Sequence, residues 1–131
     1  MSQRPSAAKS WFAKADKDLL LAELAAAHGR KLADLACYHA QQCAEKYLKG
    51  YLTHRDVPFK FVHALAYLVR LCMSADRSFA DVLSEAAELQ DYATDARYPI
   101  EGVREPTLKD ARKAVARARA IRKFVRARIR E

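Results

Sequence analysis

Residues that interrupt helices are scarce in this chain, which has only three glycines and four prolines among 131 residues. Runs of valine and isoleucine with alternating polarity are also missing, whereas alanine is abundant, so the composition favours helices over strands. The glycines stand alone at positions 29, 50 and 102, which excludes a glycine-rich phosphate loop. At this length we expect one all-α domain over residues 1–131, with residues 1–9 as a flexible N-terminus.

Signatures of metal binding, redox chemistry and membrane insertion are missing too. Cys37, Cys43 and Cys72 form no Cys-x-x-Cys pair and lie in largely apolar helical stretches, so we expect buried, reduced thiols. Neither a His-x-x-x-His pair nor an aspartate-rich loop offers metal ligands, so we expect no metal and no cofactor. No apolar run approaches about 18 residues and the N-terminus lacks an export segment, so we expect a cytoplasmic protein without a membrane span.

Helical periodicity and capping residues predict an antiparallel bundle of about five helices. The expected ranges are about 10–27, 33–54, 62–73 and 78–97, with a last helix after Thr107. Gly29 closes the first helix, while Ser78 with Asp81 and Thr107 with Asp110 resemble capping boxes that start the last two. On the first helix, the side chains expected to face the core are Phe12, Ala15, Leu19, Leu20 and Leu24.

A polar stripe runs along the predicted helix 33–54. At about 100° per residue, one arc of this helix is apolar and the opposite arc carries Tyr38, Gln42, Glu45, Lys46 and Lys49. Leu35 and Leu52 fall on the polar side, which predicts a second buried contact there, and we expect a symmetric dimer seam. Glu45 and Lys49 also have the spacing of an ordinary helix-surface ion pair, and this structural interpretation competes with a ligand-binding one.

Three separated patches stand in order along nearly the whole chain: Gln41-Gln42-Cys43-Ala44-Glu45-Lys46-Tyr47-Leu48-Lys49, then His63-Ala64-Leu65 with Leu68, then Ala96-Arg97-Tyr98-Pro99. Together they resemble the HEPN domain family of small helical proteins in prokaryotes. The resemblance implies an HEPN-like fold over the whole domain. It also implies how the ribonucleases of this family build their active site. In them, an arginine and a histidine four to six residues later form a composite site across a dimer. That pairing suits RNA cleavage, which needs a proton-transfer group and a cation that stabilises the charge on phosphorus.

Arg97 stands in the position of that arginine, but residues 98–104 contain no histidine. The four histidines, His28, His39, His54 and His63, all precede it. The resemblance therefore implies the branch with Arg-Tyr-Pro in place of the ribonuclease motif, although folding could still bring His39 or His63 close to Arg97. A guanidinium at this place fits a phosphate-binding or protein-docking role, and equally a structural ion pair with Glu45 or Asp95.

The net charge of +8 resides entirely in the last helix. Residues 1–106 hold 14 basic and 14 acidic residues, whereas residues 107–131 hold ten basic and two acidic ones. The candidate nucleic-acid contacts of this last helix are Lys113, Arg117, Lys123 and Phe124. A ring among cations can stack on a base while the cations bind phosphates. A solvated amphipathic helix, or pairing with the acidic side of the fourth helix from Asp81 to Asp95, would explain the same pattern.

The resemblance implies a function in binding rather than catalysis. Members of this branch resemble the helical component of two-gene modules whose other component is a minimal nucleotidyltransferase. We therefore expect a non-catalytic homodimeric partner in a toxin–antitoxin-like or regulatory pair, possible nucleotide binding, and Arg97, Tyr98 and the polar stripe at its docking surface. The alternative is an RNA-binding protein or ribonuclease toxin that uses Arg97 and the basic last helix.

Overall fold

The computed structural model describes residues 4–96 and 104–129, with residues 4, 5 and 92–96 described by their backbone alone. All regular secondary structure in the described part is helical, which confirms the predicted fold class. Its five α-helices are α1 (Arg4–His28), α2 (Ala33–His54), α3 (Leu65–Ala75), α4 (Leu83–Ala96) and α5 (Leu108–Ala127). Two short 3₁₀ helices, η1 (Arg30–Leu32) and η2 (Arg77–Val82), precede α2 and α4.

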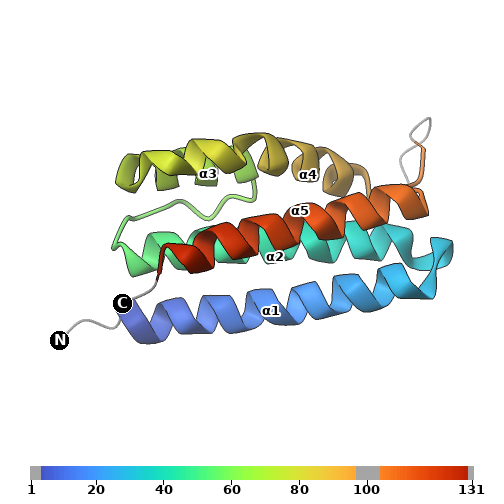
Figure 1. The fold of residues 1–131 in the computed structure, drawn as a ribbon, viewed down its shortest axis with the longest axis horizontal. Helices are drawn as coiled ribbons and strands as arrows, with labels where there is room; N and C mark the ends of the chain where they lie inside the picture. Colours follow the sequence, from blue (N-terminus) through green and yellow to red (C-terminus); the bar gives the residue numbers. More distant parts are fainter. Residues whose placement is uncertain (1–3, 97–103, 130–131) are drawn as a thin grey trace.

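The helices pack as an elongated bundle around α2 (Figure 1). α1 and α2 form a long antiparallel hairpin, α5 lies along both of them, and the shorter α3 and α4 cover the other side of α2. The central position of α2 explains its composition, because 14 of its 22 residues are buried. The polar stripe therefore lies on the most enclosed helix of the molecule.

Alanines line the contact between α1 and α2. Four buried alanines of α1 and four of α2 keep side chains small on both helices: Ala8, Ala15, Ala22, Ala25, Ala33, Ala36, Ala40 and Ala44. The prediction that Leu20 and Leu24 face the core is wrong, since they are 56% and 58% exposed. Small residues let the two backbones approach closely, and they occupy the inward positions that the larger leucines were expected to fill.

Two predicted helix ends are confirmed. α1 ends at His28, and Gly29 follows with a φ of 116°, a conformation that favours glycine. Thr107 starts α5 with a reciprocal capping box, in which its hydroxyl accepts from the Asp110 amide and its own amide donates to the Asp110 carboxylate.

Three other predicted boundaries differ. α1 begins at Arg4 rather than near Ser10, because Ala8 is already buried and Pro5 is tolerated in a first helical turn. Asp76, not Ser78, caps the segment before α4: its carboxylate accepts from the Ser78 amide and starts η2. α3 begins at Leu65, since the preceding backbone is extended at Ala64.

The three cysteines are free and buried, as predicted, and burial raises the pKa of Cys37 and Cys43 to about 12. Among the described residues, no helix is both long and apolar enough to cross a membrane.

Candidate functional site

The polar stripe of α2 divides into two ion-pair clusters, and the first is buried. Glu45 and Lys49 are only 3% and 4% exposed, and the Lys49 ammonium lies 2.8 Å from Glu45 Oε2. The same ammonium lies 5.7 Å from the centre of the Trp11 ring and 6.0 Å from that of Phe59. Lys49 is therefore neutralised by one carboxylate and enclosed by two aromatic rings, which are favourable partners for a cation.

The segment between α2 and α3 covers this cluster. His63 places Nδ1 3.1 Å from both oxygens of Glu45, and its carbonyl accepts a hydrogen bond of 3.2 Å from the side chain of Gln41. Leu52, expected at a dimer seam, is fully buried by the chain's own fold. The expectation that a second molecule covers this end of the stripe is thus wrong for Leu52, since residues 57–73 lie over α2 instead.

The second cluster joins α1 to α2. Asp18 is buried, and its carboxylate accepts from Lys46 through one oxygen and lies 2.9 Å from His39 Nδ1 through the other. The Tyr38 ring packs edge-on against His39 at 5.1 Å. In each cluster a carboxylate therefore holds Nδ1 of a histidine, which is His39 on α2 and His63 in the segment after α2. Nε2 is then the ring nitrogen that remains for other partners.

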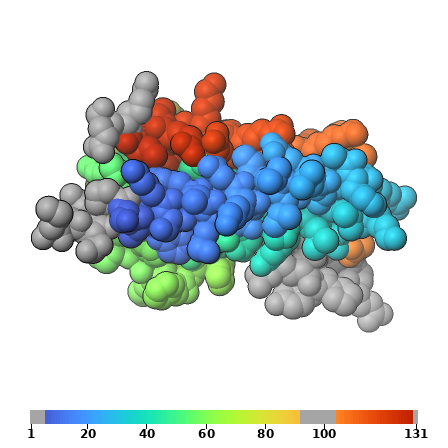
Figure 2. All heavy atoms as spheres, turned by 90° about the horizontal axis from the view of Figure 1, so that it is seen from below, coloured from blue at the N-terminus to red at the C-terminus, as the bar shows by residue number. Residues whose placement is uncertain are grey.

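Around the second cluster, α2 keeps an open face that is partly exposed to solvent. Tyr38, Gln42 and Lys46 are half-buried, and Leu35 is 45% exposed. Leu21 and Leu24 of α1 are exposed as well, and their spacing of three places them on one side of that helix. Viewed from the α1 side, α1 crosses the molecule with α5 along one edge and the beginning of α2 along the other (Figure 2).

Arg97 and Tyr98 lie outside the described residues, so their geometry stays a prediction. The backbone of α4 ends at Ala96, one residue before Arg97. The expected structural partner Glu45 is already engaged by Lys49 and His63.

About half of the cations in and just after α5 form ion pairs within the molecule. Five arginines form ion pairs with carboxylates of α1, α4 or the start of η2: Arg117 with Glu88, Arg119 with Glu23, Arg122 and Arg126 with Asp16, and Arg128 with Asp76. Lys109, Arg112, Lys113 and Lys123 are exposed and form no ion pair with any described residue. Of the predicted nucleic-acid contacts, Lys113 and Lys123 are thus accessible, whereas Arg117 holds α5 to α4.

Phe124 is not set apart from the core, contrary to the helical projection. It packs against the ring of buried Phe79 at 5.0 Å, and the Arg128 guanidinium lies 3.3 Å from its ring centre. A nucleobase would have to compete with Arg128 for that ring face.

Asp16 is the point where three helices meet. Its carboxylate accepts from the Tyr47 hydroxyl, from Arg122 Nε at 2.9 Å and from Arg126 at 2.9 Å. Burial raises the pKa of Asp16, but the hydrogen bonds from Tyr47 and Arg122 and the charges of Arg122 and Arg126 outweigh it, so the pKa lies below its ordinary value. The ionised carboxylate therefore stabilises the packing of α5 on α1 and α2.

Acid should weaken this packing. Because the folded-state pKa of Asp16 is lowered, its stabilisation is complete above the unfolded-state pKa of about 4 and is lost as the pH falls through the lower folded value. We expect Asp16→Asn to lower the free energy of unfolding by about 1 kcal/mol at pH 7, since the site is partly exposed, and by less near pH 3. Urea unfolding at both pH values measures this difference. Asp91→Asn, at an exposed carboxylate of α4, is the control, and an equal loss at both pH values would contradict the assignment.

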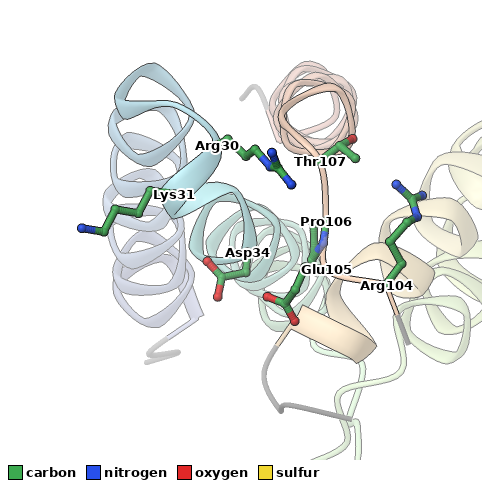
Figure 3. A pocket seen from close by; sticks show the side chains of 7 residues that line it. All are labelled: Arg30, Lys31, Asp34, Arg104, Glu105, Pro106 and Thr107. Carbon is green, nitrogen blue, oxygen red and sulfur yellow. The ribbon is translucent and has the colours of Figure 1, made fainter. Parts of the chain in front are cut away.

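A hollow of about 570 Å³ lies where η1 and the start of α2 approach the start of α5 (Figure 3). Arg30 points across it toward Pro106 and Thr107, whereas Lys31 points away. Asp34 and Glu105 also line it, and Arg104 forms a 3.7 Å ion pair with Asp110. The lining mixes both signs of charge, so it favours no one class of ligand.

The segment between α2 and α3 is a surface feature that no sequence pattern above predicted. It carries Phe61, which is 88% exposed, the most of any large apolar side chain described. A signal was available in the sequence, because the run Phe59-Lys60-Phe61 follows a helix-ending proline. Among the described residues, no group of three His, Cys, Asp or Glu side chains is arranged to hold a metal ion.

In the comparison with protein families, residues 8–128 match the model described as the HEPN domain. None of the curated proteins matches.

Two solved structures are similar over nearly their whole length. An archaeal protein described as an HEPN homologue, ST0689, is 30% identical with a TM-score of 0.76, and the match covers 94% of this chain and 98% of that one. The protein TT1696 from Thermus thermophilus is 27% identical with a TM-score of 0.75, and the match covers 97% of this chain and 98% of that one.

Proposed function

Because this chain belongs to the HEPN domain family, we propose that it is a non-catalytic binding protein, the helical partner of a minimal nucleotidyltransferase in a toxin–antitoxin-like or regulatory two-gene module. HEPN domains commonly pair with nucleotidyltransferases, which supports this class of partner. We further propose that it acts as a homodimer.

The observation that carries the proposal is that carboxylates already hold His39 and His63, the two histidines that could replace the missing one. No histidine follows Arg97 in the sequence, and His39 and His63 each have Nδ1 held by a carboxylate that also binds a lysine. Both clusters fit a structural role, since they join α1 and the α2–α3 segment to α2. Catalysis by a histidine and Arg97 would need one of these anchored rings to act from its Nε2 side.

The docking surface in this proposal includes Arg97 and Tyr98 with the open face of α2. Gln42, Tyr38 and Lys46 remain accessible in part, and Leu35 provides an apolar contact beside them. A guanidinium beside a tyrosine suits either a carboxylate of a partner protein or the phosphate of a nucleotide. Glu45 and Lys49 would support this surface from beneath rather than touch the partner.

Leu35→Asp should break the dimer without unfolding the monomer, because Leu35 is exposed in the single chain and a carboxylate there would be buried unpaired at a seam. We expect the mass from light scattering to halve. Ala87→Asp, which places the same carboxylate at an exposed position of α4, is the control. A Leu35→Asp protein that still elutes as a dimer would contradict the seam.

The two-component proposal is tested by affinity purification of the tagged protein from its native cell at moderate salt. We expect a stoichiometric nucleotidyltransferase in the eluate, identified by mass spectrometry, and its loss from the Arg97→Ala protein. Elution of RNA without a protein partner would refute this function.

The second candidate is RNA binding or cleavage that uses Arg97 and α5. It is favoured by Lys109, Arg112, Lys113 and Lys123, which are exposed and unpaired among the described residues. Binding through several phosphates would weaken by orders of magnitude between about 50 and 200 mM salt, whereas an unchanged affinity would exclude it. If the protein cleaves RNA, Arg97→Ala would abolish the cleavage.

A further inference from the structure

Three aromatic rings form a chain on the surface between α1 and the segment that follows α2. Trp11 packs edge-on against Phe59 with 6.3 Å between ring centres, and Phe59 packs edge-on against Phe61 with 6.4 Å. We call Trp11, Phe59 and Phe61 the aromatic cluster. Trp11 and Phe59 are half-buried, whereas the Phe61 ring is almost fully open to solvent.

The exposure of Phe61 is built into an anchored turn. The Val62 amide donates to the Lys60 carbonyl at 2.8 Å, which closes a three-residue turn with Phe61 at its centre. The Lys60 amide donates to the Tyr67 hydroxyl at 3.3 Å, and the His63 carbonyl is bound by Gln41. The ring is therefore presented by a fixed segment, and a partner would lose little conformational entropy by binding it.

The two stretches of sequence that form the aromatic cluster contain no acidic residue. They are residues 1–15 and 57–75, which contain no aspartate and no glutamate although the chain has 16. The same stretches carry the exposed cations Lys9, Lys14, Lys60 and Arg70. The Lys49 ammonium behind the Trp11 and Phe59 rings is neutralised by buried Glu45, so the exposed lysines and Arg70 set the charge of this surface. The ligand that complements this surface is an anion with flat apolar groups.

Space for such a group exists beside Trp11. A mainly apolar hollow of about 380 Å³ is lined by Ala7, Ser10, Trp11 and Lys14. The hollow brings one aromatic ring and one free ammonium together, which is the combination that a nucleobase and its phosphate require.

We propose that the aromatic cluster is a binding site for single-stranded nucleic acid, with a base stacked on Phe61, another against Trp11, and phosphates on Lys14 and Lys60. A protein partner fits less well, because the cores of protein interfaces are depleted in lysine, whereas nucleic-acid interfaces are strongly positive. A duplex fits less well because its bases are already stacked on one another. The site uses neither Arg97 nor α5, so its failure would leave the proposed function untouched.

Trp11 is the only tryptophan, so its fluorescence reports on this site alone. A single-stranded RNA of 12 nucleotides should quench it in a saturable way, and a duplex of the same sequence should not. Phe61→Ala should weaken binding about tenfold or more, as measured by the anisotropy of the labelled RNA, because it removes one stacking surface. Since the ring is 88% exposed, this variant should unfold at the wild-type temperature.

Matched variants separate this site from other surfaces. Phe61→Leu keeps apolar bulk but has no ring face and should bind as weakly as Phe61→Ala, whereas Leu20→Ala should bind like the wild type. Lys113→Gln with Lys123→Gln should leave the Trp11 quenching intact. Equal affinity for single-stranded DNA would assign recognition to base and phosphate, and tighter binding of RNA would add the 2′-hydroxyl; both support the site.

Three results would overturn the proposal. The first is unchanged Trp11 emission at RNA concentrations that saturate the anisotropy. The second is loss of the dimer in Phe61→Ala without any RNA binding by the wild type, which would make the aromatic cluster an interface between copies of this chain. The third is a blue shift of Trp11 with anionic phosphatidylserine vesicles but no response to RNA, which would make it a membrane contact.

Discussion

Replacing Glu45 by alanine should destabilise the protein by about 3–5 kcal/mol, because it leaves the Lys49 ammonium buried without its counter-charge. A domain of this size has a free energy of unfolding of about 5–15 kcal/mol, so the variant would be near the limit of folding. The loss also frees the His63 ring and removes one of the bonds that hold residues 57–64 on α2. Denaturant unfolding followed by circular dichroism measures the change.

A second variant also removes the Lys49 charge, which Glu45→Ala leaves unpaired. Glu45→Ala with Lys49→Met should recover most of the stability, since an apolar side chain of similar length fits between Trp11 and Phe59 without a desolvation cost. Glu105→Ala, at an exposed glutamate of the loop before α5, should change the stability by no more than a few tenths of a kcal/mol. If the free energy of unfolding of Glu45→Ala equalled that of the wild type, this explanation would be wrong, because the Lys49 ammonium would then have to be hydrated in the variant.

This outcome bears on the function of the polar stripe. The spacing of Glu45 and Lys49 is compatible with a surface ion pair or with a ligand site, and the sequence does not distinguish the two. Burial does, because side chains 3% and 4% exposed cannot contact a partner directly. The stripe contributes to docking through Tyr38, Gln42 and Lys46, and the buried pair sets the surface on which they stand.

Local signals in the sequence predicted the elements well. Helix ends are fixed by hydrogen bonds and backbone conformations of adjacent residues, as at Gly29 and at the capping box of Thr107 and Asp110. A few consecutive residues are therefore enough to predict where such a helix begins or ends. The burial of Leu52 and the position of His63 depend instead on Gln41 and Glu45, about twenty residues away in sequence. No pattern within α2 shows that residues 57–64 will return to cover it.

The exposed leucines of α1 show a related limit. A helical projection assigns large apolar side chains to the buried side, and it therefore predicted that Leu20 and Leu24 face the core. The contact between α1 and α2 selects small size instead, so alanines occupy the inward positions and the leucines remain outside. How closely two helices approach depends on both of them, and at Gly50 of α2 even one added methyl group would collide with side chains of α1.

Gly50→Ala should therefore destabilise the protein, although alanine is about 1 kcal/mol better than glycine within a helix. A Cβ at position 50 would lie 2.5 Å from Phe12 Cε1, 2.8 Å from Phe12 Cδ1 and 3.0 Å from Trp11 Cβ. Phe12 cannot turn aside easily, because it is buried and its ring stacks on Tyr47 with 5.3 Å between centres. We expect a net loss of about 1–3 kcal/mol, the usual cost of overpacking, measured by urea unfolding.

A double-mutant cycle with Phe12→Leu tests this cause directly. The shorter side chain removes the two ring atoms that the new methyl group would meet, at the cost of a smaller core residue. In the Phe12→Leu background the change Gly50→Ala should then be neutral or stabilising, because only the helix propensity of alanine remains. An equal loss in both backgrounds would place the conflict at Trp11 Cβ instead. Since Trp11 belongs to the aromatic cluster, the emission of this tryptophan in the Gly50→Ala protein would show whether the strain reaches that surface.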